Sequence, residues 1–198
     1  YNKNDSGRTE HERRRDEIRA VIDSVDQSLR IYYGFGSQGE AGLPAPIRDL
    51  LKRLKADPSF EIKDLSKTEL DKIKARLVEL SSDDVHFGQS AIFALHDVLS
   101  RYLARENRPA PSMRELVEAV LFADVLTGVV TPEFQGNMQF SAYTLKAVAA
   151  SYALKLQGLR LSWEYLTKLV NGGSPVLVNI EDRHFVVVTG ITSSPCQG

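Results

Sequence analysis

The strand-like segments of this chain come last, after a long series of helix-like segments, and that order restricts its fold more than any other feature. Residues 174–191, SPVLVNIEDRHFVVVTGI, have the pattern of one strand, a tight turn and a second strand. Upstream, apolar residues recur at the three- and four-residue spacing of amphipathic helices. Because strands and helices do not alternate, the sequence predicts an α+β fold rather than a parallel β-α-β sheet. The order of the segments and the absence of a Walker A motif argue against a nucleotide-binding fold.

The helix-like segments have recognisable starts and stops. A Ser or Thr followed three residues later by Glu forms a capping box, which predicts helix starts at Thr9, Ser66 and Ser112. Gly158 is predicted to end the helix that precedes it. The stretch 89–105 has a broad apolar surface and is expected to be the buried centre of the domain. Helices are predicted over residues 9–33, 46–58, 66–80, 89–105, 112–128, 141–158 and 162–173.

The length of the chain suits one sizeable core. It has 198 residues, of which 42% are hydrophobic, so two independent domains would each have only a small core. Residues 34–46, GFGSQGEAGLPAP, contain four glycines and two prolines and interrupt the helical pattern. We expect a helix-rich N-terminal extension over residues 1–79 and the main domain over residues 80–198.

The balance of charges argues against a nucleic-acid partner. The chain has 25 basic and 26 acidic residues and a net charge of −1, so no general polyanion-binding surface is expected. No apolar run approaches the roughly 18 residues of a membrane-spanning helix, and we expect no membrane span in this chain. Because the chain begins with Tyr1 rather than methionine, a preceding segment that associates with a membrane stays an open alternative.

Cysteine and histidine do not suggest a metal or cofactor site. Cys196 is the single cysteine, so it forms neither an internal disulfide nor a Cys-x-x-Cys pair. The four histidines, His11, His86, His96 and His184, lack a metal-ligand spacing such as His-Glu-x-x-His. We therefore expect no metal and no cofactor.

The second half of the chain resembles a known family in its helices and its final hairpin. Small and apolar residues recur at set positions in this half: Leu145, Ala149, Leu156, Gly158, Leu159, Leu161, Pro175, Val176, Leu177, His184, Phe185, Val186, Val187, Val188 and Gly190. This pattern is similar to that of the bacteriocin-processing cysteine peptidases, papain-like domains that act on double-glycine leaders and are often fused to ABC exporters. The resemblance extends from about residue 80 to residue 191. It implies a papain-like core, in which a central helix packs on a small antiparallel sheet.

The resemblance also implies where catalytic residues would lie. The family has a nucleophilic cysteine at the start of the central helix, where the helix N-terminus and a neighbouring imidazolium lower the pKa of the thiol. The aligned segment here is FGQSAI, residues 87–92, so Phe87 stands at the position of the nucleophile. The oxyanion-hole glutamine of the family aligns with Ser81, and the residue that orients the histidine would lie beyond Gly198. Of the catalytic residues that the family has, the sequence matches only the base, at His184.

The candidate catalytic residues also have structural interpretations. His184 is either a papain-type base or a relict or structural residue at the start of a strand. Ser90 lies three positions after Phe87, about 300° around a helix, and is not expected to replace the nucleophile. Cys196 would need a tight reversal of the chain to reach His184.

Other polar and aromatic residues suit structural roles better than catalytic ones. His86 follows Asp83 and Asp84, which are typical of a helix N-terminus. His96 is expected to make a polar contact beside Asp97 on its helix. The arginines of residues 11–15 have acidic residues on both sides in the sequence, as on a solvated helix face. Candidate aromatic anchors for an interface are Trp163, Tyr165, Tyr32, Tyr33 and Phe35.

These observations favour a non-catalytic pseudo-peptidase that binds a peptide or protein partner, or that serves as a structural subunit of a larger assembly. The alternative is an active papain-like cysteine peptidase that processes a leader peptide. A third interpretation is a helical scaffold, in which the hairpin is isolated from the helix that starts near Gly88. The resemblance implies a bacterial cell envelope or periplasm, or the cytoplasmic face of an exporter; the sequence alone leaves the compartment open.

Overall fold

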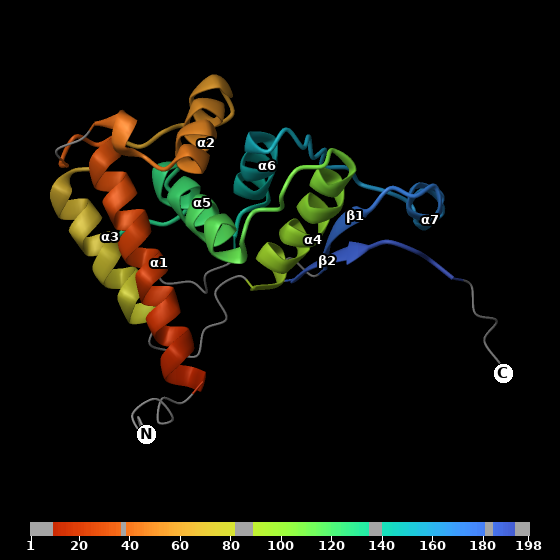
Figure 1. The fold of residues 1–198 in the computed structure, drawn as a ribbon, viewed down its shortest axis with the longest axis horizontal. Helices are drawn as coiled ribbons and strands as arrows, with labels where there is room; N and C mark the ends of the chain where they lie inside the picture. The colour runs from red at the N-terminus through yellow and green to blue at the C-terminus, as the bar shows by residue number, and fades with distance from the viewer. Residues whose placement is uncertain (1–9, 37–38, 82–88, 135–139, 181–183, 193–198) are drawn as a thin grey trace.

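The chain folds into a helical body followed by a small hairpin (Figure 1). The computed structural model describes residues 10–36, 39–81, 89–134, 140–180 and 184–192. The elements in this part are α1 (Glu10–Tyr32), η1 (Glu40–Gly42), α2 (Ala45–Ala56), α3 (Lys67–Leu80), α4 (Gln89–Arg105), α5 (Met113–Leu126), α6 (Ala142–Ser151), α7 (Trp163–Asn171), β1 (Val176–Ile180) and β2 (His184–Val188). The predicted order of helices and then strands is confirmed, and the architecture is α+β and mostly helical.

Two capping boxes begin α3 and α5 where the sequence predicts them. The backbone N–H of Ser66 donates to Glu69 Oε2 at 2.8 Å, and the N–H of Glu69 donates back to Ser66 Oγ at 3.3 Å. Ser112 and Glu115 form the same reciprocal pair at 2.6 and 3.2 Å. Each box satisfies N–H groups that the first turn of a helix otherwise leaves without partners.

The buried centre of the molecule is α5, and the prediction that this helix would be α4 is wrong. Helix α4 buries one apolar face but leaves Phe93 59% exposed. Helix α5 contacts α1, α2, α4 and α6, and its apolar side chains are buried around the helix. The buried residues of α5 are Leu116 and all residues from Ala119 to Leu126. A helix that is apolar on all sides needs neighbours on all sides, whereas an amphipathic helix needs them on its apolar face only.

Helix α6 ends at Ser151, and the prediction that it would continue to Gly158 is wrong. Ala153 has a positive φ of 68°, and the N–H of Leu154 donates to the carbonyl of Ala149 at 3.0 Å. This left-handed residue ends the helix in the way that a glycine often does. The chain then turns so that Leu154 and Leu156 pack against the core. Both leucines are partly buried there, and their packing favours the turn that the left-handed alanine makes.

The hairpin lies against α4 at one end of the helical body (Figure 1). Strands β1 and β2 pair antiparallel, with Val176 opposite Val188 and Ile180 opposite His184. Helix α7 packs against β1. The hairpin is therefore not isolated from the helices, as the scaffold interpretation would require.

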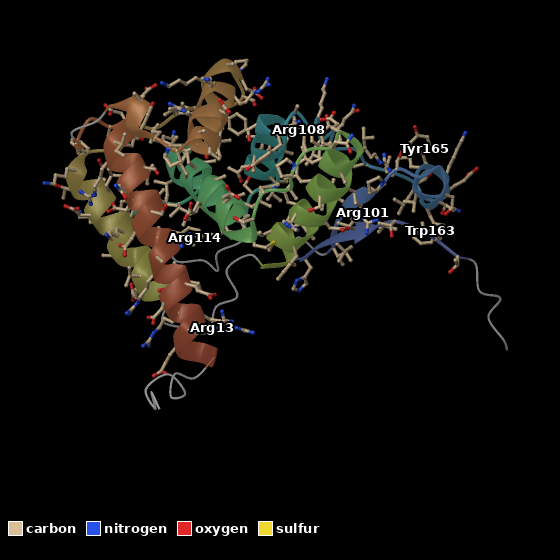
Figure 2. All side chains as sticks on the ribbon, in the orientation of Figure 1. Arg13, Arg101, Arg108, Arg114, Trp163 and Tyr165 are labelled. Atoms are coloured by element: carbon tan, nitrogen blue, oxygen red, sulfur yellow. The ribbon has the colours of Figure 1, made fainter. Side chains whose placement is uncertain are left out.

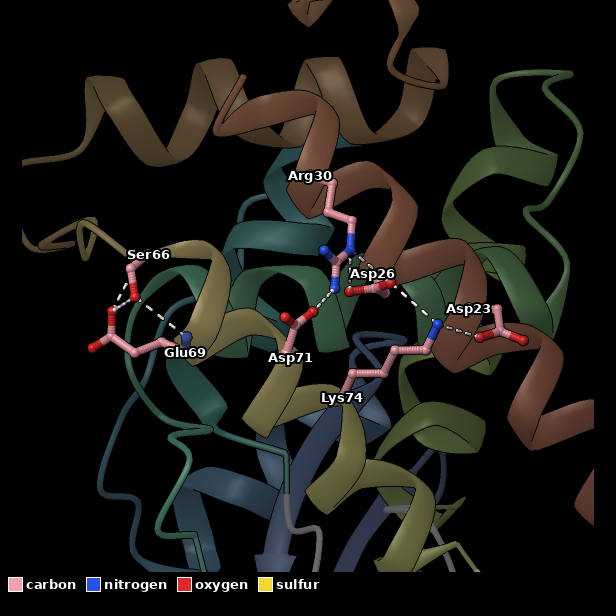
Figure 3. Close-up of polar contacts among 7 residues, drawn as sticks. All are labelled: Asp23, Asp26, Arg30, Ser66, Glu69, Asp71 and Lys74. Carbon is pink, nitrogen blue, oxygen red and sulfur yellow. Dashed lines mark hydrogen bonds and ion pairs between the residues drawn. The ribbon is translucent and has the colours of Figure 1, made fainter. Parts of the chain in front are cut away.

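A polar cluster joins α1 to α3 (Figure 3). Arg30 donates from Nε to both carboxylate oxygens of Asp26 at 3.0 Å, and from Nη2 to Asp71 Oδ1 at 2.5 Å. Lys74 approaches Asp23 at 2.8 Å and Asp26 at 3.2 Å. The Asp26 side chain is only 12% exposed, so its charge is partly removed from water and shared by two cations.

Removing the charge of Asp26 should weaken this cluster measurably. We expect Asp26→Asn to lower the free energy of unfolding by about 1–2 kcal/mol, because Arg30 and Lys74 both lose their shared partner. Asp49→Asn is the control, since Asp49 pairs with Lys52 on the exposed surface at 59% and 77% exposure. That control should change stability by less than about 0.5 kcal/mol. Urea unfolding measures both, and equal effects of the two substitutions would contradict the role of Asp26.

Candidate functional site

His184 opens β2 and is exposed. Side chains alternate along a strand, so His184 and Phe185 leave β2 on opposite faces. Phe185 is half-buried and packs against the core, which places His184 on the outer face of the hairpin. Among the residues that the structure describes, the His184 side chain has no hydrogen-bond or ion-pair partner. The imidazole is thus accessible, but no described side chain orients it or could exchange a proton with it through a direct hydrogen bond.

The first turn of α4 lies beside the start of β2. The N–H of Phe185 donates to Ser90 Oγ at 3.5 Å, a long hydrogen bond between segments 95 positions apart in the sequence. Ser90 was not expected to replace the nucleophile, because its side chain points about 300° around the helix from position 87. The structure brings the Ser90 hydroxyl to the backbone of β2. Ser90 therefore helps to attach the hairpin to α4.

The other residues implied by the resemblance do not form a described catalytic group. Phe87 lies outside the residues that the structure describes, as do the separate candidates His86 and Cys196. Ser81, aligned with the oxyanion-hole glutamine, is buried at the C-terminal end of α3. Its hydroxyl donates to the carbonyl of Val78 at 2.7 Å, which is a helix-end contact.

The polar residues expected on helix surfaces lie there. Arg13 pairs with Glu17 on the exposed face of α1. Asp97 accepts two hydrogen bonds at 3.0 Å from Arg101 Nε, rather than one from His96. These short-range pairs are typical of solvated helices and indicate no binding site of their own.

The outer face of the hairpin and α7 carry exposed apolar side chains. Register and alternation place Val176, Val178, Ile180 and their partners from β2 on the face opposite α4. Ile180 is 44% exposed and Val186 is 37% exposed. Figure 2 shows Trp163 and Tyr165 on α7, at the end of the molecule remote from α1 and α3. They are 71% and 49% exposed.

The backbone of β1 has a free edge next to this face. Within the described ranges, Val176–Ile180 form backbone hydrogen bonds with β2 alone. The segments VLVNI and HFVVV contain no charged residue, proline or bulge, the usual features that protect a sheet edge. An exposed edge beside apolar side chains can accept another extended chain. We call β1, the outer face of the hairpin and Trp163 of α7 the edge surface.

Metal and membrane features are not found in the described part of the chain. Its His, Cys, Asp and Glu side chains form no group of three that could hold a metal ion. None of the helices described there is long and apolar enough to cross a membrane.

Asp124 is an unusual buried carboxyl that the sequence analysis missed. It lies on α5 with 1% exposure, and its Oδ1 has no hydrogen-bond partner among the described residues. Burial raises the pKa of Asp124 to about 7, and a hydrogen bond with Thr144 opposes this only in part. The signal in the sequence is a single acid within the apolar run AVLFADVL, residues 119–126. An acid inside the apolar second half of a helix is buried with it when that part of the helix has neighbours on all sides.

No family model, curated protein or solved structure matches this chain. The site is therefore interpreted from its own geometry.

Asp124 should make stability depend on pH. The unfolded chain has an Asp pKa of about 3.9, so between that value and about 7 the folded protein holds more protons. The free energy of unfolding should fall as the pH rises from about 4 to about 7, and then level off. Asp124→Asn cannot titrate and should be more stable than the original protein at pH 8, by up to about 4 kcal/mol.

Urea unfolding of both proteins at pH 4.5 and pH 8 measures this difference. Other groups titrate equally in the two proteins, so the difference between them isolates Asp124. Parallel pH profiles would contradict the burial of an ionisable group at this position.

Proposed function

We propose that this chain is a non-catalytic pseudo-peptidase that binds an extended peptide segment of a partner protein without cleaving it. The observation that carries the proposal is the free, uncharged edge of β1 next to α7, the helix that packs against β1 and carries the exposed Trp163. In this mode the peptide adds a strand to the hairpin, and its backbone supplies the hydrogen bonds that β1 lacks.

The chemistry of the edge surface favours an apolar, extended ligand. Its strand residues are mostly valine and isoleucine, and no charged residue lies on either strand. A strand with alternating apolar residues would cover Val178 and Ile180 and remove them from water. Trp163 is suited to serve as an aromatic anchor of the kind that dominates many binding interfaces, whereas Tyr165 leaves α7 about 200° further around the helix.

The environment of His184 supports binding rather than catalysis. Phe87 aligns with the nucleophile of the resembled family, and a benzyl side chain cannot attack a carbonyl. His184 lies on the same outer face as Val186, where it can contact a bound peptide. A hydrophobic fold persists after loss of a nucleophile, because packing does not depend on the thiol.

An active papain-like peptidase that processes a leader peptide is the second candidate. The contact between the first turn of α4 and the start of β2 supports it, since the resemblance implies that a central helix and the histidine strand meet at the catalytic site. In that case the nucleophile is supplied by a residue other than Phe87.

Binding and its location can be tested together. We expect double-glycine leader peptides, the substrates implied by the resemblance, to bind and to slow amide hydrogen exchange in β1, at Leu177 and Asn179. Trp163→Ala should weaken binding about tenfold, because the largest exposed aromatic is lost. Tyr143→Ala is the control, since Tyr143 is 64% exposed on α6 and away from the edge surface. Binding without protection of β1, or equal effects of the two substitutions, would place the ligand elsewhere.

Cleavage separates the two candidate functions. The same peptides, incubated with the protein before and after treatment with iodoacetamide, are examined by mass spectrometry. Intact peptides are expected in both samples. Cleavage that alkylation abolishes would overturn the pseudo-peptidase proposal and establish a cysteine peptidase.

A further inference from the structure

A pocket lies at the C-terminal end of α1, in the helical body. Its volume is about 450 Å³, which is enough for a small organic group. The last turn of α1, η1 and the extended segment before α3 form its walls. The lining residues are Tyr32, Tyr33, Glu40, Ile62, Lys63 and Asp64.

The aromatic wall of this pocket is held rigidly. The rings of Tyr32 and Tyr33 meet edge to face, with centroids 4.8 Å apart and planes at 71°. Phe35 stacks on Tyr33 at 6.4 Å. The Tyr33 hydroxyl donates to the carbonyl of Lys63 at 2.6 Å, which anchors that ring.

An ammonium group of the chain itself already contacts Tyr32 and Glu40, two of the residues that line the pocket. Lys55 Nζ lies 5.1 Å from the centroid of the Tyr32 ring and 2.7 Å from Glu40 Oε1. An aromatic face recognises alkylated ammonium ligands, and a neighbouring carboxylate adds a charge of opposite sign. Lys55 is 43% exposed at the side chain, so it can return to water at little cost.

The remaining charges of the pocket also favour a cation. Lys63 Nζ pairs with Glu61 at 3.0 Å, and the aliphatic part of its side chain lies near Gly128. Within the described part of the chain, Asp64 has no ion-pair partner. The pocket thus has two carboxylates, from Glu40 and Asp64, and both of its nearby ammonium groups are engaged by carboxylates of the chain.

We propose that this pocket binds a trimethylammonium group, which takes the place of the Lys55 ammonium against Tyr32 and Glu40. A primary ammonium is strongly hydrated and gains little from an aromatic face, whereas methyl groups reduce hydration and widen contact with the ring. The group can belong to a free choline-like molecule or to a trimethylated lysine of a peptide. The proposal does not depend on the edge surface or on the pseudo-peptidase function.

Two-dimensional NMR titration with choline, with a trimethyl-lysine peptide and with the same peptide carrying unmodified lysine tests the proposal. Chemical-shift changes at residues around Tyr32 are expected with choline, with the trimethylated peptide, or with both. The probe that causes them shows whether the trimethylammonium group belongs to a free molecule or to a peptide. The unmodified peptide should bind at least about threefold more weakly than its trimethylated form.

Substitutions separate recognition from competition. Tyr32→Ala should reduce binding at least about fivefold, whereas Tyr32→Phe keeps the ring and should retain it. Lys55→Met removes the internal competitor and should tighten binding about two- to fivefold. Lys52→Met on the same helix is the control and should have no effect, since Lys52 pairs with Asp49 instead.

Three outcomes would overturn the proposal. The first is the absence of shifts with every trimethylammonium probe at millimolar concentration, in both the original protein and Lys55→Met. The second is equal affinity for the modified and unmodified peptides. The third is weaker binding after Lys55→Met in a protein whose thermal unfolding is unchanged.

Discussion

Helix α5 carries apolar side chains around its circumference, so a single neighbour cannot remove it from water. Helices α1, α2, α4 and α6 surround it, and one continuous core unites them. This core includes residues on both sides of position 79, because α1 and α2 supply much of the cover of α5. The same enclosure explains Asp124, whose carboxyl is carried into the core by the helix to which it belongs.

The hairpin depends on this body but is not enclosed by it. One face packs on α4, which supports a pair of strands that would be marginal in isolation. The other face keeps Ile180 and Val186 partly in water, and the edge of β1 has no further strand beside it in the described part. Stability therefore resides in the helices, while the surface best suited to bind another chain lies on the hairpin and α7.

Much of the fold could be predicted because local signals determine it. The capping boxes at Ser66 and Ser112 begin their helices through contacts within four residues, and those contacts form wherever the helix lies. The end of α6 was predicted wrongly because the left-handed residue that ends the helix is Ala153 rather than a glycine, and Leu154 and Leu156 pack against the core beyond it. The central helix was also misassigned, since periodicity measures how apolar a helix is but not which helices surround it.

The sequence by itself determined the order of helices and strands, the register-defining alternation of the hairpin, and the single histidine at the start of its second strand. Local spacing and short-range hydrogen bonds are sufficient for these features. Only the tertiary structure decided that His184 faces away from α4, that Ser90 meets the backbone of β2, and that Lys55 lies over Tyr32 beside Glu40. These contacts join residues distant in the chain, and their geometry depends on how whole helices pack around α5.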